Sequence, residues 1–488
     1  MAASGDRVIE TVTPGSFDPV QHYYTRVLNA AIHPLVNFFL RLPLKRLVSR
    51  YCHLNPRVDP GVLEEILHYS PRFFRWAGAD LLHVTTSAGN RRMVVIETNS
   101  SPSGQKSMPL FAEHQEQGGY RFLIDRVFAP ALKAARAPAG ALAVIYDKNY
   151  MEASGYAAAM ADYFDEQVYL VPFFQDDHNR YARVENRILG INMGNDWIPL
   201  RAAFRYVTQK PWNRLPHGLR TFMLNPVICC LAGGRNKMVA AIAYDLFNSE
   251  IAGSGLQIKT PETVREVSKA EVPLLVKKFG GFAVVKIPYS NAGQGVFTVT
   301  SPVELEAFMQ REFHYDRFIV QSLIGNYQWS SEGAHGKYYH VGTVPDRNNH
   351  IYVADLRMMV GATPNGYAPV AVYARRAAKP LADNIVEGGD SWSMLGTNLS
   401  VKLAEDKWDS DTSRLLLMDR RDFNRLGIGL DELLEAFVQT VMASVAIDKM
   451  ACNLVTKKGS FRYKLFSSLN DDKAFISEII RNDHKANE

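Results

Sequence analysis

The sequence predicts a protein of mixed α/β and α+β class, and the order of its apolar segments carries this prediction. Residues 141–146 and 167–172 are short apolar segments separated by a helical pattern at 154–164, and this strand–helix–strand order favours a parallel sheet. Later, 351–360 and 368–374 are long apolar segments typical of antiparallel strands. The 488 residues, of which 47% are hydrophobic, suffice for two or three structural units with ample core.

The first half of the chain divides into two predicted regions. Residues 1–91 form an N-terminal helical region, in which 60–67 has apolar residues at helical spacing behind a proline. Residues 92–253 form an α/β domain. It begins with the short apolar strand 92–97, which runs into the turn-rich segment 98–104.

The second half also divides into two predicted regions. Residues 254–324 form a small module, in which the strands 282–288 and 295–299 lie on either side of a glycine-bearing loop. The remainder, 325–488, contains the long antiparallel strands. It closes with a helix and a hairpin, at 430–447 and around 457–460.

Composition narrows the classes of partner. The formal charge of +5 is too small for this length to indicate nucleic-acid binding. It suits a cleft that receives anions, although a weakly basic surface without function explains it equally well. The most apolar early stretch, 27–44, is too interrupted for a membrane span, and the first residues do not resemble a signal peptide. Four scattered cysteines form neither a CxxC pair nor a disulfide framework. We therefore expect a cytoplasmic protein with reduced thiols and without membrane or nucleic-acid partners, and a homodimer stays open.

One group of residues with phosphate-binding chemistry lies in the predicted module. Lys286 ends a buried strand, and a glycine-rich turn with Asn291, Gly293 and Gly295 follows it. A fixed cation and backbone N–H groups that no Cβ shields can bind phosphate oxygens. The turn has neither the Walker ending nor the Rossmann spacing. A plain glycine hairpin explains it too, but a lysine inside an apolar strand needs a partner.

A second group combines an acid and an amide. Glu97 and Asn99 lie two residues apart at the end of an apolar strand, so their side chains point to the same face. Carboxylate and amide oxygens are ligands that Mg²⁺ prefers. The alternative is an exposed strand end with ordinary turn residues.

A third group places charges on the long strands. Asp355 and Arg357 share one face, and Arg375 and Arg376 end the next strand. These side chains can hold a metal-bound phosphate, stabilise a transferring phosphoryl group or bind a carboxylate. They can equally form ion pairs across the sheet without catalysing anything.

Together these motifs resemble the ATP-grasp superfamily. The strand that ends at Lys286, with the glycine-rich turn behind it, is similar to that family's lysine strand and phosphate loop. The resemblance extends to Lys237 as the second nucleotide lysine, with the nearby Arg235 as the alternative cation for this role. It also extends to an adenine hinge, whose residues are Gln321, Ser322 and Leu323. It implies an ATP-grasp fold with a parallel pre-ATP-grasp-like region at 92–253, a lid at 254–324 and the core domain at 325–488.

The order of the motifs is similar to that of the circularly permuted ATP-grasp enzymes, such as eukaryotic-type glutathione synthetase. ATP-grasp enzymes commonly end with a strand bearing Glu-x-Asn, but here Ser468 precedes Asn470 in the corresponding late segment, and Glu97 and Asn99 come early instead. The permuted family's further glutamate is missing from the lysine loop, so Asp355 is the predicted third metal ligand.

The resemblance implies an ATP-dependent ligase that uses Mg²⁺ and joins a small-molecule carboxylate to an amine through an acyl phosphate. Arg357, with Arg375 or Arg376, then stabilises negative charge during both steps. Two other functions stay open: a kinase that phosphorylates a hydroxyl on the same scaffold, and a nucleotide-binding protein without catalysis. A dehydrogenase lacks a credible dinucleotide turn.

Overall fold

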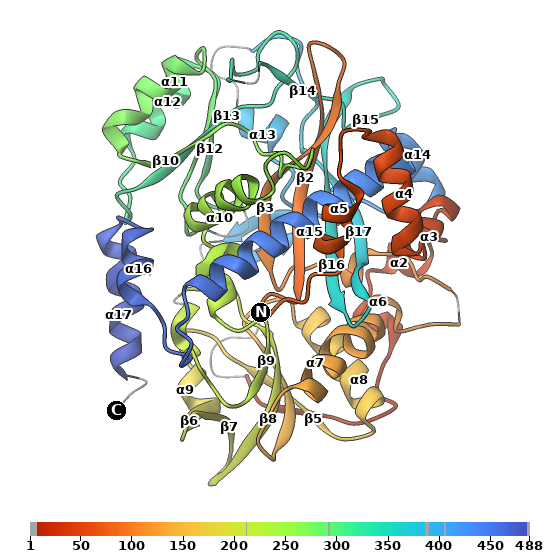
Figure 1. The fold of residues 1–488 in the computed structure, drawn as a ribbon, viewed down its shortest axis with the longest axis vertical. Coiled ribbons are helices and arrows are strands. Elements are labelled where there is room, and N and C mark those ends of the chain that lie inside the picture. The colour runs from red at the N-terminus through yellow and green to blue at the C-terminus, as the bar shows by residue number, and fades with distance from the viewer. Residues whose placement is uncertain are drawn as a thin grey trace.

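The computed structural model describes residues 7–112, 114–210, 212–290, 293–334, 336–385, 390–404 and 407–485. Within these ranges the strands form three larger sheets and one small hairpin, β18 (Ser400–Ala404) with β19 (Lys407–Ser410). Figure 1 shows one sheet at the bottom, a second through the middle and a third at the upper left. The mixed α/β and α+β class is therefore confirmed.

The bottom sheet is the predicted parallel unit. Its order is β1-β5-β4-β8-β7-β6, with β9 beside β8, and β4 runs parallel to both β5 and β8. The helix α8 (Tyr150–Phe164) connects β4 to β5 and packs on both, which confirms the strand–helix–strand prediction. The strands are β1 (Glu10–Val12), β4 (Ala141–Tyr146), β5 (Val168–Pro172), β6 (Ala182–Glu185), β7 (Ile188–Met193), β8 (Asp196–Tyr206) and β9 (Phe222–Leu224).

The middle sheet is antiparallel and joins segments from distant parts of the chain. Its order is β14-β2-β16-β17-β20, with β15 beside β16 and β3 beside β2. The long helix α15 (Leu430–Asn453) packs against β2, β3 and β16, so one face of the sheet is covered (Figure 1). The strands are β2 (Trp76–Thr86), β3 (Arg91–Ser100), β14 (Tyr338–His340), β15 (Thr343–Pro345), β16 (Ile351–Thr363), β17 (Gly366–Arg376) and β20 (Leu415–Leu416).

The helical prediction for residues 1–91 is wrong from Trp76 onward, where the chain forms β2. This strand is central, so most of its residues are buried on both faces and no apolar–polar alternation identifies it as a strand. The preceding helices agree with the prediction. They are α1 (Pro19–His22), α2 (Thr25–Leu28), α3 (Pro34–Leu40), α4 (Leu44–Leu54) and α5 (Pro60–Leu67).

The predicted late strand with Ser468 is also wrong, because that segment is helix α16 (Tyr463–Ser468). The hairpin around 457–460 reduces to one bridge between Val455 and Phe461. The remaining helices are α6 (Gly118–Leu123), α7 (Ala129–Ala134), α9 (His178–Tyr181), α10 (Lys237–Glu250), α13 (Ser391–Leu395), α14 (Arg420–Leu426) and α17 (Lys473–Lys485). In the described ranges, none of the helices combines the length and apolar character needed to cross a lipid bilayer.

The third sheet lies within the predicted module 254–324. Its order is β10-β13-β11-β12, all antiparallel, and the helices that belong to it are α11 (Val272–Lys278) and α12 (Pro302–Gln310). Its own hydrophobic core includes Phe279, Phe308 and Phe318. We call this small unit the lid. Its strands are β10 (Thr263–Val267), β11 (Ala283–Lys286), β12 (Val296–Val299) and β13 (Phe318–Ser322).

Candidate active site

A cleft of about 1340 Å³ lies between the lid, the middle sheet and the carboxyl ends of the parallel strands. Most of the residues that the sequence predicted for function line this one cleft. They are Glu97, Asn99, Lys237, Lys286, Gly293, Gly295, Gln321, Ser322, Leu323, Asp355, Arg357 and Arg375. The early acidic strand end and the later lysine strand therefore face the same space. Asn291 lies outside the described residues.

Strand register explains why the middle sheet presents a polar face to this cleft. Asp80 on β2 is paired with Glu97 on β3 and with Arg357 on β16, and Arg357 is paired with Tyr373 on β17. Side chains that are opposite each other in a sheet point to the same face. One row across four strands thus carries four polar side chains. The next residue of β2, Leu81, points to the other face and belongs to the hydrophobic core.

Four of the charged residues form a buried network. The Arg357 guanidinium donates two hydrogen bonds to the Asp80 carboxylate, at 2.6 and 2.7 Å, and Arg375 lies 3.0 Å from the same carboxylate. Arg375 also pairs with Asp355, whose side chain is completely buried. The two guanidinium groups hold the pKa of Asp80 well below its usual range, against the opposing effect of burial. Asp80 therefore stays ionised as the partner of both arginines, whereas burial raises the pKa of Asp355 despite the attraction of Arg375.

Two lysines flank Glu97. The Lys237 ammonium lies 3.4 Å from a Glu97 carboxylate oxygen and donates to the Ser290 carbonyl at 2.6 Å. Lys237 is the first residue of α10, which Asn236 caps through its side chain. Lys286 ends β11 and donates to the Ile96 carbonyl at 3.2 Å. Burial, with a smaller effect of Lys237, lowers the pKa of Lys286 to about 8 despite the attraction of Glu97.

The glycine-rich turn covers the cleft beside Lys286. Gly293 and Gly295 both have a φ of 75°, which only glycine adopts readily. A Cβ on Gly293 would also lie 2.8 Å from the Asn398 amide nitrogen and 3.2 Å from the Trp392 ring. The turn therefore requires glycine for both its backbone and its close packing.

The predicted adenine hinge is the end of β13. Gln321, Ser322 and Leu323 line the cleft, as the resemblance implied. The Leu323 amide already donates to the Ser331 hydroxyl at 2.6 Å. A base bound by this main chain would have to replace that hydrogen bond, or use the neighbouring carbonyl groups.

Two predicted roles do not agree with the geometry. Arg376 lies outside the cleft because it follows Arg375 on a strand and so points to the other face. Its guanidinium stacks over the Tyr352 ring, 4.5 Å from the centroid, in a separate pocket. Asp355 lines the cleft but is committed to Arg375, so it is a poor third metal ligand.

The remaining oxygen ligands fit magnesium. Within the described ranges, no group of three or more His, Cys, Asp or Glu side chains could hold a metal. Mg²⁺ usually takes only one or two carboxylates and completes its shell with substrate phosphates and water. Glu97 supplies a carboxylate, and the buried Asn99 amide nitrogen lacks a hydrogen-bond partner. Rotating that amide by 180° would place its oxygen at the same point.

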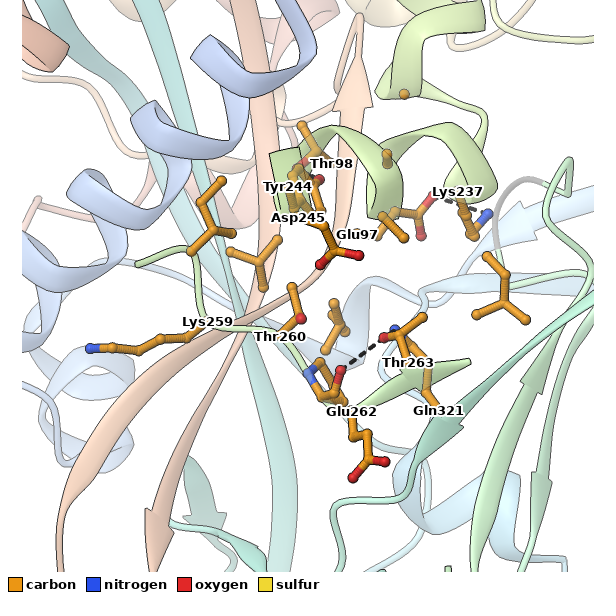
Figure 2. A pocket seen from close by; sticks show the side chains of 18 of the residues that line it. Glu97, Thr98, Lys237, Tyr244, Asp245, Lys259, Thr260, Glu262, Thr263 and Gln321 are labelled. Carbon is orange, nitrogen blue, oxygen red and sulfur yellow. Dashed lines mark hydrogen bonds and ion pairs between the residues drawn. The ribbon is translucent and has the colours of Figure 1, made fainter. Parts of the chain in front are cut away.

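A smaller pocket of about 270 Å³ adjoins the cleft. Figure 2 shows Glu97 and Lys237 across this pocket from Thr263 and Gln321. The cleft and this pocket share Glu97, Lys237, Lys286 and Gln321 as lining residues, so these side chains are accessible from both.

Sequence reasoning missed Asp80 and Lys148 as parts of the site, whereas Arg235 was an alternative to Lys237 as the second nucleotide-binding cation. Asp80 interrupts an apolar run in the same way as Glu97, and this signal was available once the run was recognised as a strand. Lys148 follows β4, and Arg235 precedes α10; both line the cleft. The sequence around Lys148 carries no comparable signal, because Asp147 and Asn149 on either side are typical turn residues.

No protein-family model and no curated protein sequence matches the chain. Several solved structures do. An ATP-grasp RimK domain protein from Sphaerobacter thermophilus is 15% identical, with a TM-score of 0.28 over 50% of this chain and 92% of that one. A glutathione synthetase-like effector from Globodera pallida is 8% identical, with a TM-score of 0.39 over 71% of this chain and 86% of that one.

D-alanyl-alanine synthetase A from Vibrio cholerae is 10% identical, with a TM-score of 0.30 over 53% of this chain and 93% of that one. At such identities a likeness concerns the fold alone. Of these three structures, the RimK domain protein is the one named as an ATP-grasp protein.

Proposed function

We propose that this protein is an ATP-dependent ligase that activates a carboxylate by phosphorylation and joins it to an amine. The observation that supports this proposal most strongly is the shared cleft. It brings Glu97 and Asn99 of β3 together with Lys237, Lys286 and the glycine-rich turn of the lid. Carboxylate and amide oxygens beside two lysines form a site for a metal-bound polyphosphate.

Each part of the cleft has a distinct task in this proposal. Lys237 and Lys286 bind the nucleotide phosphates, and the amides of the glycine-rich turn cover the terminal phosphate. Glu97 and Asn99 hold Mg²⁺, which neutralises phosphate charge when bound. The ion pair between Lys237 and Glu97 keeps both side chains in place until the nucleotide arrives.

The proposed reaction has two steps. A carboxylate oxygen of the acid attacks the γ-phosphorus of ATP, so that a P–O bond forms and ADP leaves. The amine then attacks the acyl carbon, loses a proton and displaces inorganic phosphate. Arg357 and Arg375 lie in this cleft with their charges balanced by Asp80 and Asp355. They therefore act as oriented hydrogen-bond donors rather than as net positive charge.

An ADP-release screen tests this proposal. The full chain is supplied with ATP, Mg²⁺ and a panel of carboxylic acids, with and without amines, and with hydroxylamine to trap acyl phosphates. We expect acid-dependent ADP release and a hydroxamate product. Glu97→Gln and Lys286→Ala should each lower the rate by a factor of about 100 or more.

Matched controls are available on exposed helix positions. Glu64→Gln on α5 and Lys277→Ala on α11 make the same kinds of change away from the cleft and should leave the rate unchanged. A phosphoester product from an alcohol would indicate the kinase instead. Nucleotide binding without turnover on any acid would indicate the non-catalytic protein.

A further inference from the structure

Two cations meet in the part of the cleft formed by the parallel sheet. Lys148 donates to the Ser101 carbonyl at 3.3 Å, and Arg235 donates to the carbonyls of Ser100 and Ser101, at 3.0 and 3.4 Å. Ser101 has a φ of 57°, in the left-handed region that a serine rarely adopts. This strained residue offers one carbonyl oxygen to both cations and so holds them close together.

Neither cation has a carboxylate partner. Within the described part of the chain, Lys148 and Arg235 take part in no ion pair, and the Arg235 Nε is buried without a hydrogen-bond partner. Burial lowers the pKa of both groups, and their mutual repulsion adds to the effect on Lys148. Two like charges held close together, Arg235 buried and Lys148 half-buried, are unfavourable without a counter-ion, and a bound anion would relieve this.

The carboxylates that attract Lys148 already have other hydrogen-bond or ion-pair partners. Glu152 accepts hydrogen bonds from the amides of Gly104 and Gln105, both at 2.6 Å, and from the Tyr206 hydroxyl at 2.6 Å. Asp147 pairs with Arg214 at 2.8 Å. Both attract the Lys148 ammonium from a distance, while Arg235 and Arg357 repel it. These four charged groups around Lys148 do not cancel the excess positive charge.

Most of the other cations in the cleft already have a negative partner or a role in the proposed function. Lys237 is paired with Glu97, and Arg357 and Arg375 are paired with Asp80 and Asp355. A nucleotide would occupy Lys286 and Lys237 in the proposed function. The carboxylate that is to be activated must lie near the γ-phosphate. Four further cations line the cleft, Lys106, Lys148, Lys210 and Arg235. Of these, Lys148 and Arg235 share the Ser101 carbonyl and so form a pair that can bind one further negative group.

We propose that the acid substrate carries a second carboxylate, which binds between Lys148 and Arg235. The substrate class is therefore a dicarboxylic or tricarboxylic acid rather than a simple fatty or amino acid. This inference rests on the proposed function for the carboxylate that is phosphorylated. Lys148 and Arg235 then determine specificity, because an acid with one carboxylate would leave both cations without a counter-ion.

Matched acid pairs test the inference. Glutarate is compared with pentanoate, and L-glutamate with L-norvaline, because each pair differs only in the second carboxylate. In at least one pair, we expect kcat/KM for ADP release to be about tenfold or more higher with the dicarboxylate than with the monocarboxylate. Lys148→Met should lower kcat/KM for the dicarboxylate about ten- to a hundredfold and leave that for the monocarboxylate unchanged.

Control variants separate this role from a structural one. Lys148→Arg keeps the charge and should keep the preference. Lys133→Met changes an exposed lysine outside the cleft and should have no effect. Equal use of both members of every pair, or an equal loss for both in Lys148→Met, would overturn the inference.

A binding measurement decides the question even where variants fail to fold. Titration calorimetry of the unmodified protein, with a non-hydrolysable ATP analogue and Mg²⁺, compares glutarate with pentanoate and L-glutamate with L-norvaline. Tighter binding of the dicarboxylates supports the inference, and equal or absent binding rejects it. ADP release with no acid at all would refute the proposed ligase, whereas equal release with both members of a pair refutes only the second carboxylate.

Discussion

Lys286 illustrates how the environment of one side chain can set the conditions for nucleotide binding. Its ammonium is buried at the end of β11, with the Ile96 carbonyl as its hydrogen-bond acceptor. Burial lowers its pKa to about 8 in the free protein. A bound phosphate would favour the charged form and raise this pKa again.

The affinity for ADP should therefore fall as the pH rises. Below about pH 8 the lysine is charged in both the free and the bound protein, so affinity does not depend on its titration. Above that pH the free protein must take up a proton to bind, and affinity falls up to about tenfold per pH unit. Calorimetry from pH 7 to 9.5 measures this. Lys286→Arg, which stays charged throughout, should give a flat profile; a flat profile for the unmodified protein would contradict the expectation.

Single residues were predictable from the sequence where a polar side chain interrupts an apolar strand. Glu97 and Lys286 were recognised in this way, and both line the cleft. The sequence could not tell which of Arg375 and Arg376 lines the cleft. Neighbours on a strand point to opposite faces, but the sequence does not show which face meets the cleft. The pairing of Arg375 with Asp80 depends on the order of strands in the sheet, which the sequence does not display.

At the scale of the element, the network between β2, β16 and β17 fixes the polar floor of the cleft. Asp80 is the shared acceptor for two arginines, and its side chain is only 7% exposed. Removing one member of a buried charge network leaves the others without compensation, which is more damaging than losing an exposed ion pair.

Asp80→Asn should lower the free energy of unfolding by about 3 kcal/mol or more. Asp431 provides the matched control. It also accepts two hydrogen bonds from an arginine, Arg50, but both side chains are well exposed, at 39% and 45%. Asp431→Asn should therefore cost less than about 1 kcal/mol. Urea denaturation of both variants measures the difference, and equal losses would show that the network does not stabilise the sheet.

The glycine-rich turn of the lid supports a second prediction at this scale. Gly293→Ala adds a Cβ against Asn398 and Trp392, at 2.8 and 3.2 Å, in addition to the backbone strain at a φ of 75°. Gly281→Ala has comparable strain, at a φ of 94°, but no atom lies within 4 Å of its Cβ. Each variant should lose about 1 kcal/mol of stability from the backbone alone. Only Gly293→Ala should also weaken binding of a non-hydrolysable ATP analogue, by about tenfold, because the turn is displaced from the terminal phosphate. Similar affinities of the two variants for the ATP analogue would contradict a phosphate-covering role.

Whole elements were predictable where length and periodicity are distinctive, as in α8 and the long strands β16 and β17. Trp76–Thr86 was not, because a strand buried on both faces shows no alternation. The late segment with Ser468 was misassigned for another reason. The expected Glu-x-Asn strand was sought at the chain position usual in the family, whereas Tyr463–Ser468 is a helix and Glu97 with Asn99 occupies the cleft.

At the scale of the molecule, helix α15 packs a late part of the chain against an early one. This helix follows the last strand of the middle sheet in the sequence, yet it covers β2 and β3, which lie more than 300 residues earlier. Its buried Asp448 accepts hydrogen bonds from the amides of Arg72, Phe73 and Phe74, at 3.0, 2.7 and 2.7 Å, and from the Tyr69 hydroxyl at 2.8 Å. One carboxylate therefore fixes the chain at the point where it enters β2.

Asp448→Ala tests how much the hydrogen bonds between α15 and residues 69–74 contribute to stability. The substitution leaves three backbone amides near the start of β2 without an acceptor, that of Phe74 buried and those of Arg72 and Phe73 partly buried. A buried group left unsatisfied costs about 1–3 kcal/mol. We therefore expect a loss of about 3 kcal/mol or more, measured by urea denaturation. Asp431→Asn on the same helix is the control, with little change expected. Because β2 carries Asp80, a local effect would spread to the cleft, and the variant should also bind ADP more weakly at temperatures well below its unfolding transition. A variant as stable as the control, with unchanged ADP affinity, would mean that burial of α15 alone holds the N-terminal strands in the sheet.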